Sequence, residues 1–283
     1  METAAEVIAE IRTGAPLDCD ITTVIVDETL GEEPIPRSLG SSDRIVFLPF
    51  RYGNHTALVH TLRHRIEMSN FDWICLLDGD GEDRPEDLWT LMSAATHGKE
   101  VVLAGRRSRN SSLIFNIGYF LFQVIHRVLT GEGFRTGTFS VVSTQWLAKN
   151  IARPEFSISL AGALASLPAK RELIFCDRGK RRRGYAKLKA RNAIEHALRT
   201  LIIRSNNIAV RSFVALACST LLATIGIVYV SVLVTYDLNS PGWITSALTL
   251  AVLTVGLFLT VFLVSCVLFC LILLHSLPRG SER

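Results

Sequence analysis

The sequence predicts an α/β domain with a mostly parallel sheet and flanking helices, followed by a membrane-embedded C-terminal part. Before Arg211, short β-branched runs alternate with helical segments, which is typical of a parallel sheet covered by helices on both faces. Nearly all charged residues also precede Arg211, whereas residues 213–235 and 238–274 contain none. These two observations divide the chain into a charged part and an apolar part.

The expected helices and strands follow from residue periodicity. Apolar residues at helical spacing between glutamates predict a helix over 1–13, and a second helix is expected from about 54 to 67. Pro85 followed by two acids is typical of a helix start. The expected strands are short and rich in β-branched or aromatic residues: Ile21–Val26, Arg44–Pro49, Trp73–Leu77 and Glu100–Leu103.

Charged side chains follow three of these strands. Asp27 follows the first, Asp78 and Asp80 follow the third, and arginines at 106–109 follow the fourth. In open α/β sheets, ligands bind beyond the carboxyl ends of the strands. We therefore expect these residues to gather at one edge of the sheet and to form the functional site.

Two long apolar stretches predict a transmembrane hairpin. A spanning helix needs about 20 apolar residues, and both Phe213–Thr235 and Trp243–Leu274 are long enough. The segment between them holds turn-forming residues and one acid, but no lysine or arginine. Basic residues flank the two outer ends of the hairpin, so the positive-inside rule predicts that the N-terminal part and the C-terminus are cytoplasmic.

We expect a multi-pass protein of the cytoplasmic (inner) membrane, with three regions. A cytoplasmic domain spans 1–188, an interfacial amphipathic helix 189–211, and two transmembrane helices 212–276. The six cysteines contain no Cys-x-x-Cys pair, and reduced thiols fit a cytoplasmic location best.

Two further segments are predicted to lie on the membrane surface. Leu113–Leu129 is strongly apolar but is interrupted by polar residues too often to span a bilayer. Asn192–Ile203 alternates apolar residues with charged ones at helical spacing. The alternative for both segments is a helix of the domain core.

The acidic run after the third strand predicts a metal–diphosphate site. Asp78, Asp80 and Glu82 are each two residues apart, and carboxylate oxygens at this spacing suit Mg²⁺ or Mn²⁺. Such a cation commonly takes one or two carboxylates together with substrate phosphates. An EF-hand is excluded, because Asp83 occupies the position of the required glycine. A solvated acidic turn is the alternative.

Two groups of basic residues predict phosphate binding. Arg106, Arg107 and Arg109 follow the fourth strand, and arginine matches phosphate oxygens in a bidentate way. A longer block runs from Arg178 to Arg191 without an acid. Its position shortly before an apolar span favours a lipid phosphate or the membrane surface over nucleic acid.

Several of these segments together resemble family-2 glycosyltransferases, and most closely the polyprenyl-phosphate branch that includes dolichyl-phosphate mannose synthases. Leu77–Glu86 is similar to the acidic segment of that family. Further similar segments follow in the family order over about residues 20–235: Arg51–Leu58, Ala104–Arg109, Gly137–Ser140 and Asp177–Leu188.

The resemblance implies a GT-A type domain that transfers a sugar, with inversion, from a UDP- or GDP-linked donor to a polyprenyl phosphate. Asp27, Asp78 and Arg107 are then expected to bind the donor, and Asp78, Asp80 and Glu82 to hold the metal. Asp80, Arg106 and Arg109 are the expected catalytic residues, with the two arginines at the acceptor phosphate. Membrane lipid is an expected partner, a homo-oligomer is possible, and no nucleic acid is expected.

Three departures from the family pattern keep two other functions open. Thr138 stands where many relatives carry aspartate, and Arg84 replaces the first proline of a pair. The family also opens with a strand that builds one wall of the nucleotide pocket, whereas this sequence opens with the following helix. The alternatives are a non-catalytic homologue with an incomplete donor site, and a transferase to a hydroxyl acceptor that uses another acid as its base.

Overall fold

The computed structural model describes residues 2–27, 32, 43–48, 53–64, 67, 70–106, 113–177, 179, 182, 190–235 and 243–276. The chain divides into two compact units. The first contains residues 1–119 and 134–200, and the second contains residues 120–133 and 201–283. The division falls within two helices, α4 (Leu113–Thr130) and α8 (Ala190–Ile203).

The main sheet of the first unit has four strands in the order β3-β5-β4-β6. β5 (Thr136–Ser143) runs antiparallel to both of its neighbours, β3 (Trp73–Leu76) and β4 (Val101–Arg106), whereas β6 (Arg171–Cys176) runs parallel to β4. The prediction of a mostly parallel sheet is therefore wrong. The cause is the entry point of β5.

The chain enters β5 at the edge where it leaves β4. Gly105, near the end of β4, pairs with Thr136, the first residue of β5, and Val101 at the start of β4 pairs with Val142. A strand that starts at the carboxyl end of its neighbour has to run in the opposite direction.

Two further strands form a separate sheet in the described part of the chain. β1 (Val24–Asp27) and β2 (Arg44–Phe47) are parallel and pair from Val24 with Arg44 to Asp27 with Phe47. Asp27 therefore lies at the carboxyl end of its strand, as the sequence predicts.

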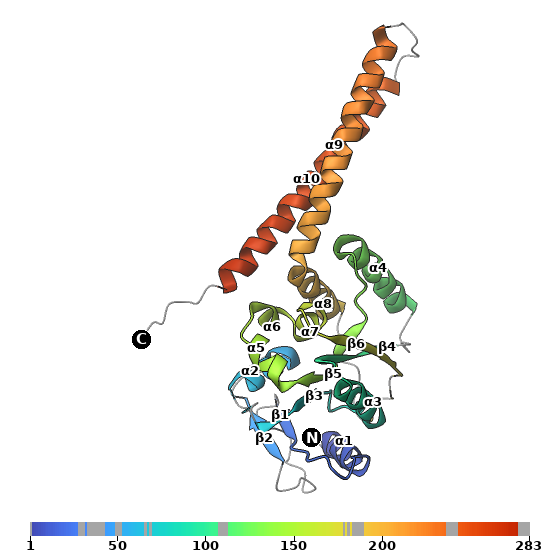
Figure 1. Cartoon of the computed structure of the whole chain (residues 1–283). Helices are drawn as coiled ribbons and strands as arrows, with labels where there is room; N and C mark the ends of the chain where they lie inside the picture. Colours follow the sequence, from blue (N-terminus) through green and yellow to red (C-terminus); the bar gives the residue numbers. More distant parts are fainter. Residues whose placement is uncertain are drawn as a thin grey trace. The chain divides into compact units, whose positions relative to one another are not determined.

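Helices cover both faces of the main sheet (Figure 1). Alternate residues of β4 point to opposite faces: Val102 and Ala104 pack with α1 (Glu2–Thr13) and α3 (Pro85–Thr96), while Val101 and Leu103 belong to the core on the other side. That second core is built by four helices of the unit: α2 (Asn54–His64), α5 (Thr144–Asn150), α6 (Pro154–Ile158) and α7 (Leu160–Ser166).

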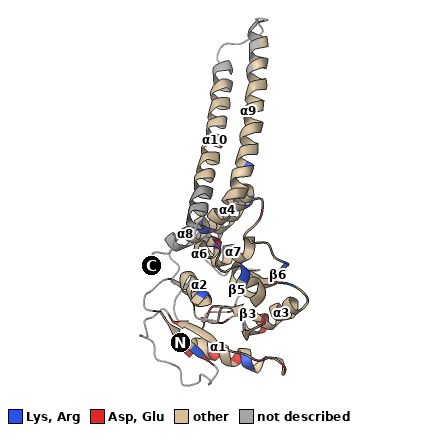
Figure 2. Ribbon diagram, turned by 60° about the vertical axis from the view of Figure 1, so that its left-hand side comes forward, with Lys and Arg blue, Asp and Glu red and all other residues tan. Residues whose placement is uncertain are grey.

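The second unit contains two long apolar helices, α9 (Ser205–Thr235) and α10 (Trp243–Ser276). They pack against each other, and the rings of Phe213 and Phe262 are 5.7 Å apart. Their described lengths are almost free of charge, whereas α1 carries both acidic and basic residues and α3 begins with two acidic residues (Figure 2).

By length and composition, one stretch among the described residues could cross a membrane, namely Ser205–Gly226 in α9. Leu248–Val264 in α10 is apolar but shorter. The predicted turn at 236–242 lies outside the described residues.

Candidate functional site

The acidic loop, residues 78–83, connects the carboxyl end of β3 to α3. The loop folds on itself: the Asp78 N–H donates to Asp83 Oδ2 at 2.9 Å, and the Glu82 N–H donates to Asp80 Oδ1 at 3.0 Å. Gly81 has a φ of +79°, a left-handed conformation that glycine adopts without strain. Carboxylates therefore follow a buried strand within one short, hydrogen-bonded turn.

Two described residues after β6, Gly179 and Arg182, contact this loop. The Gly179 N–H donates to the Glu82 carbonyl at 2.9 Å, and the Arg182 N–H donates to the Asp80 carbonyl at 3.2 Å. A Cβ on Gly81 would lie 2.8 Å from Arg182 Cγ. Gly179 and Arg182 thus pack directly on the acidic loop, and Gly81 leaves the space for the Arg182 side chain.

Arg182 makes a second contact that the sequence does not indicate. Its guanidinium lies 2.6 Å from Glu10 Oε2 and 3.7 Å from Glu6 Oε2, both on α1. The hydrogen bond from Arg182 lowers the pKa of the Glu10 carboxyl, and the same bond raises the pKa of Arg182. The basic block was expected to bind lipid phosphate, but this described member of it binds glutamates of its own domain.

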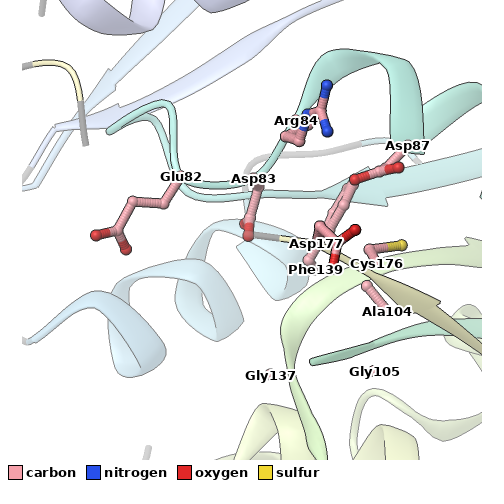
Figure 3. Close-up of a pocket in the computed structure, with 10 residues that line it drawn as sticks. All are labelled: Glu82, Asp83, Arg84, Asp87, Ala104, Gly105, Gly137, Phe139, Cys176 and Asp177. Carbon is pink, nitrogen blue, oxygen red and sulfur yellow. The ribbon is translucent and has the colours of Figure 1, made fainter. Parts of the chain in front are cut away.

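A small pocket opens beside the acidic loop (Figure 3). Its wall combines the start of α3 with the carboxyl ends of β4 and β6 and the start of β5, so it lies at the sheet edge where the sequence places the site. In Figure 3 the side chain of Glu82 points away from those of Asp87 and Asp177. The lining residues are Glu82, Asp83, Arg84, Asp87, Ala104, Gly105, Gly137, Phe139, Cys176 and Asp177.

Three carboxylates of this pocket were missed by sequence reasoning: Asp83, Asp87 and Asp177. Burial raises the pKa of Asp87, Arg84 opposes this, and the negative charges of Glu86 and Asp177 add to the increase. Asp83 is buried, and it holds the loop through the Asp78 N–H. The sequence feature that could have identified them is their position. Asp83 and Asp87 are four residues apart at a helix start, and Asp177 follows the last strand.

The structure brings some of the predicted site residues together. Asp78, Asp80 and Glu82 share the acidic loop, and Glu82 reaches the pocket wall. Asp27 is buried at the end of β1, in the two-stranded sheet. Arg106 ends β4 directly after Gly105 of the pocket, but its side chain lies outside the described part of the chain, as do Arg107 and Arg109.

The donor chemistry of the loop fits a hard divalent cation, because Asp78 and Asp80 offer carboxylate oxygens. Within the described residues, no group of three or more His, Cys, Asp or Glu side chains is placed to hold a metal ion. Two carboxylates are nevertheless sufficient where substrate phosphates complete the coordination.

Comparison with models of protein families and with curated proteins finds no match for this chain.

Proposed function

We propose that the protein is a membrane-anchored, inverting glycosyltransferase that moves a sugar from a nucleotide-diphosphate donor to a polyprenyl phosphate. The observation that carries the proposal is the acidic loop between β3 and α3, next to a pocket at the carboxyl ends of β4 and β6. This is the position at which an α/β sheet binds its ligand. The ordered motif resemblance over residues 20–235 supports the GT-A assignment.

The proposed reaction needs little acid–base chemistry. A phosphate monoester has a second pKa near 6 and is mostly dianionic at pH 7. One of its oxygens attacks the anomeric carbon of the sugar, and the bond from that carbon to the donor diphosphate breaks with inversion. Arg106 and Arg109 would hold the acceptor phosphate in line, which is a positioning role that can lower the barrier substantially.

The donor would be held by the acidic loop and its surroundings. Asp78 and Asp80 would bind Mg²⁺ or Mn²⁺ with the donor diphosphate, and the cation would stabilise the charge that develops on the leaving group. Glu82 would complete this set, Asp27 would bind the nucleoside, and Arg107 would contact the diphosphate. The site would face the cytoplasm.

The proposed anchor is the α9–α10 hairpin. Ser205–Gly226 has the length and composition of a span, and α10 packs along α9. The distribution of basic residues favours an inner-membrane protein with a cytoplasmic domain and C-terminus. Packing of the same helices between two copies would produce a homo-oligomer.

The direct test is nucleotide binding to the detergent-purified full chain. We expect UDP or GDP to bind in the presence of Mn²⁺ and to be released by EDTA. Asp80→Asn should abolish this binding yet preserve the fold, because an amide Oδ1 can still accept the Glu82 N–H. Asp72→Asn, the same change at the opposite end of β3, is the control and should bind normally. Metal-dependent binding unchanged in Asp80→Asn would contradict the metal assignment.

A non-catalytic homologue is the second candidate, and one observation favours it. β1 and β2 do not pair with the main sheet among the described residues, so Asp27 lies in a separate sheet from the strands of the pocket. Failure of both nucleotides to bind a folded protein would favour this second function over transfer.

A hydroxyl acceptor would require a general base, and Asp87 is the residue that fits. It lines the pocket, and its raised pKa is the property expected of such a base. Transfer to hydroxyl acceptors that is lost in Asp87→Asn would select this variant of the function.

A further inference from the structure

The second unit contains a helix segment that exposes its apolar side. In the C-terminal part of α4, five apolar residues recur at helical spacing and are 42–69% exposed. They define what we term the α4 stripe: Phe120, Leu121, Val124, Ile125 and Val128. In a water-soluble protein such a stripe would face the core.

The opposite side of the same helix segment is polar and buried. His126 is 0% exposed and Thr130 is 3% exposed. The His126 Nδ1–H donates to the Glu132 carbonyl at 2.7 Å, and the Thr130 hydroxyl donates to the His126 carbonyl at 2.8 Å. Polar groups thus face the protein and apolar groups face outward, which is the arrangement expected where the surrounding medium is lipid.

Two arginines fix the end of α4 to the start of α9, within the same unit. Arg204 Nη1 lies 2.7 Å from Glu132 Oε2, and Arg211 Nε donates to the Val128 carbonyl at 3.0 Å. The Arg211 guanidinium also occupies the space beside Gly131, because a Cβ at this glycine would lie 3.0 Å from Arg211 Nη1. The α4 stripe is therefore held beside the first turns of the stretch that could cross a membrane, Ser205–Gly226.

The exposed apolar surface continues from α4 onto α9. Val210, Phe213 and Val214 on α9 are all more than half exposed. Arg127, next to the stripe on α4, and Arg211 are exposed cations at the same end of the span. Apolar side chains with basic residues at their border are typical of a helix that lies at the headgroup level of an anionic bilayer.

We propose that the C-terminal part of α4 is an in-plane membrane helix whose stripe inserts into the interfacial region of the bilayer, locked to the span by Arg204 and Arg211. The partner of this surface is the lipid bilayer. The proposal rests on the proposed membrane anchor and adds a second contact to it. Only residues 107–112 separate β4, which ends at the pocket, from α4. The helix that carries the stripe therefore begins only a few residues after Arg106 and Arg109 in the sequence.

The test is fluorescence quenching by brominated lipids in proteoliposomes of the full chain, which contain phosphatidylcholine and phosphatidylglycerol. Phe120→Trp adds a reporter on the α4 stripe, and the wild-type emission is subtracted. We expect lipids brominated near the headgroup to remove most of the added emission and lipids brominated near the chain ends to remove little. Leu17→Trp, at a fully exposed position after α1, should not be quenched by either lipid.

A third variant separates this inference from the membrane anchor itself. Leu222→Trp lies in the candidate span and is exposed, so we expect deep bromines to quench it. Quenching of Leu222→Trp without quenching of Phe120→Trp would overturn the α4 inference alone. Absence of quenching in both would overturn the anchor and the inference that rests on it. If Val124→Asp converted a dimer into a monomer while Phe120→Trp stayed unquenched, the stripe would be a protein interface and the lipid assignment would be wrong.

Discussion

The helices α3 and α4 lie on either side of β4 in the sequence and use their apolar residues in opposite ways. In α3, Leu88, Leu91 and Ala95 are 0–3% exposed and pack on the sheet. In the C-terminal part of α4 the apolar residues are exposed, whereas His126 and Thr130 are buried. Both helices are amphipathic, so periodicity alone does not distinguish them.

The difference teaches that the surrounding medium, and not the pattern, decides which face of a helix packs. A helix in water gains free energy when its apolar face leaves the solvent. A helix in lipid gains nothing from hiding apolar side chains, but it gains from satisfying its polar groups inside the protein. α3 fits the first rule, and the second unit fits the other in the membrane location that we propose for it.

The largest effect is expected from shortening a leucine in each helix. Leu91 is 0% exposed, and a Leu→Ala change in a packed core costs about 2–5 kcal/mol. Leu121 is 56% exposed, so the same change there should cost less than about 1 kcal/mol of the free energy of unfolding. Thermal unfolding of the detergent-solubilised full chain, followed by circular dichroism, should therefore show a clear loss for Leu91→Ala and almost none for Leu121→Ala. Equal losses would mean that both helices pack in the same way.

The second prediction concerns the stability of the fold at low pH and tests the half-buried His55 and the buried His126. Burial is the main cause that lowers the pKa of His55 from 6.5 to about 4, and its Nδ1 accepts the Leu160 N–H at 2.9 Å. Because the folded protein binds this proton less readily than the unfolded chain, the contribution of His55 to stability is complete above about pH 6.5 and is lost as the pH falls towards 4.

The measurement is the melting temperature between pH 7 and pH 4 for wild type and His55→Asn. Asparagine keeps an acceptor for the Leu160 N–H but does not titrate in this range, so the variant should have the flatter profile. His97→Asn removes an exposed histidine and is the control, with the wild-type slope expected. Burial also lowers the pKa of His126, so the inner face of α4 should weaken in acid in the same direction. A His55→Asn profile as steep as that of wild type would contradict this account.

Local sequence patterns were sufficient for most helices and for the strands before the acidic loop. The expected helix over 1–13 is α1 (Glu2–Thr13), and Trp73–Leu77 and Arg44–Pro49 contain β3 and β2. The strand at 21–26 and that at 100–103 are displaced by a few residues toward their carboxyl ends. These elements have strong periodicity or caps, which are properties of neighbouring residues.

The order of the sheet and much of the pocket could not be predicted in this way. β5 is not among the predicted strands, although its threonines and valines favour a strand. It occupies an interior position in the sheet, with Val141 and Val142 packed on opposite faces. Pairing between strands far apart in the sequence leaves no local signal. The same holds for the contact of Arg182 with Glu10, which joins residues 172 positions apart.

The smallest predicted effect compares the ends of α3 and α4. Both are followed by a left-handed glycine, Gly98 with φ +86° and Gly131 with φ +89°. Alanine at either position should cost about 1 kcal/mol of backbone strain. Nothing lies within 4 Å of a Cβ at Gly98, but at Gly131 it would meet Arg211, which binds the Val128 carbonyl. Gly98→Ala should therefore lower the melting temperature alone, whereas Gly131→Ala should also weaken the quenching of Phe120→Trp by shallow bromines, because α4 is released from α9. Unchanged quenching in Gly131→Ala would show that Arg211 does not hold the helix, and that insertion of the stripe alone determines its position.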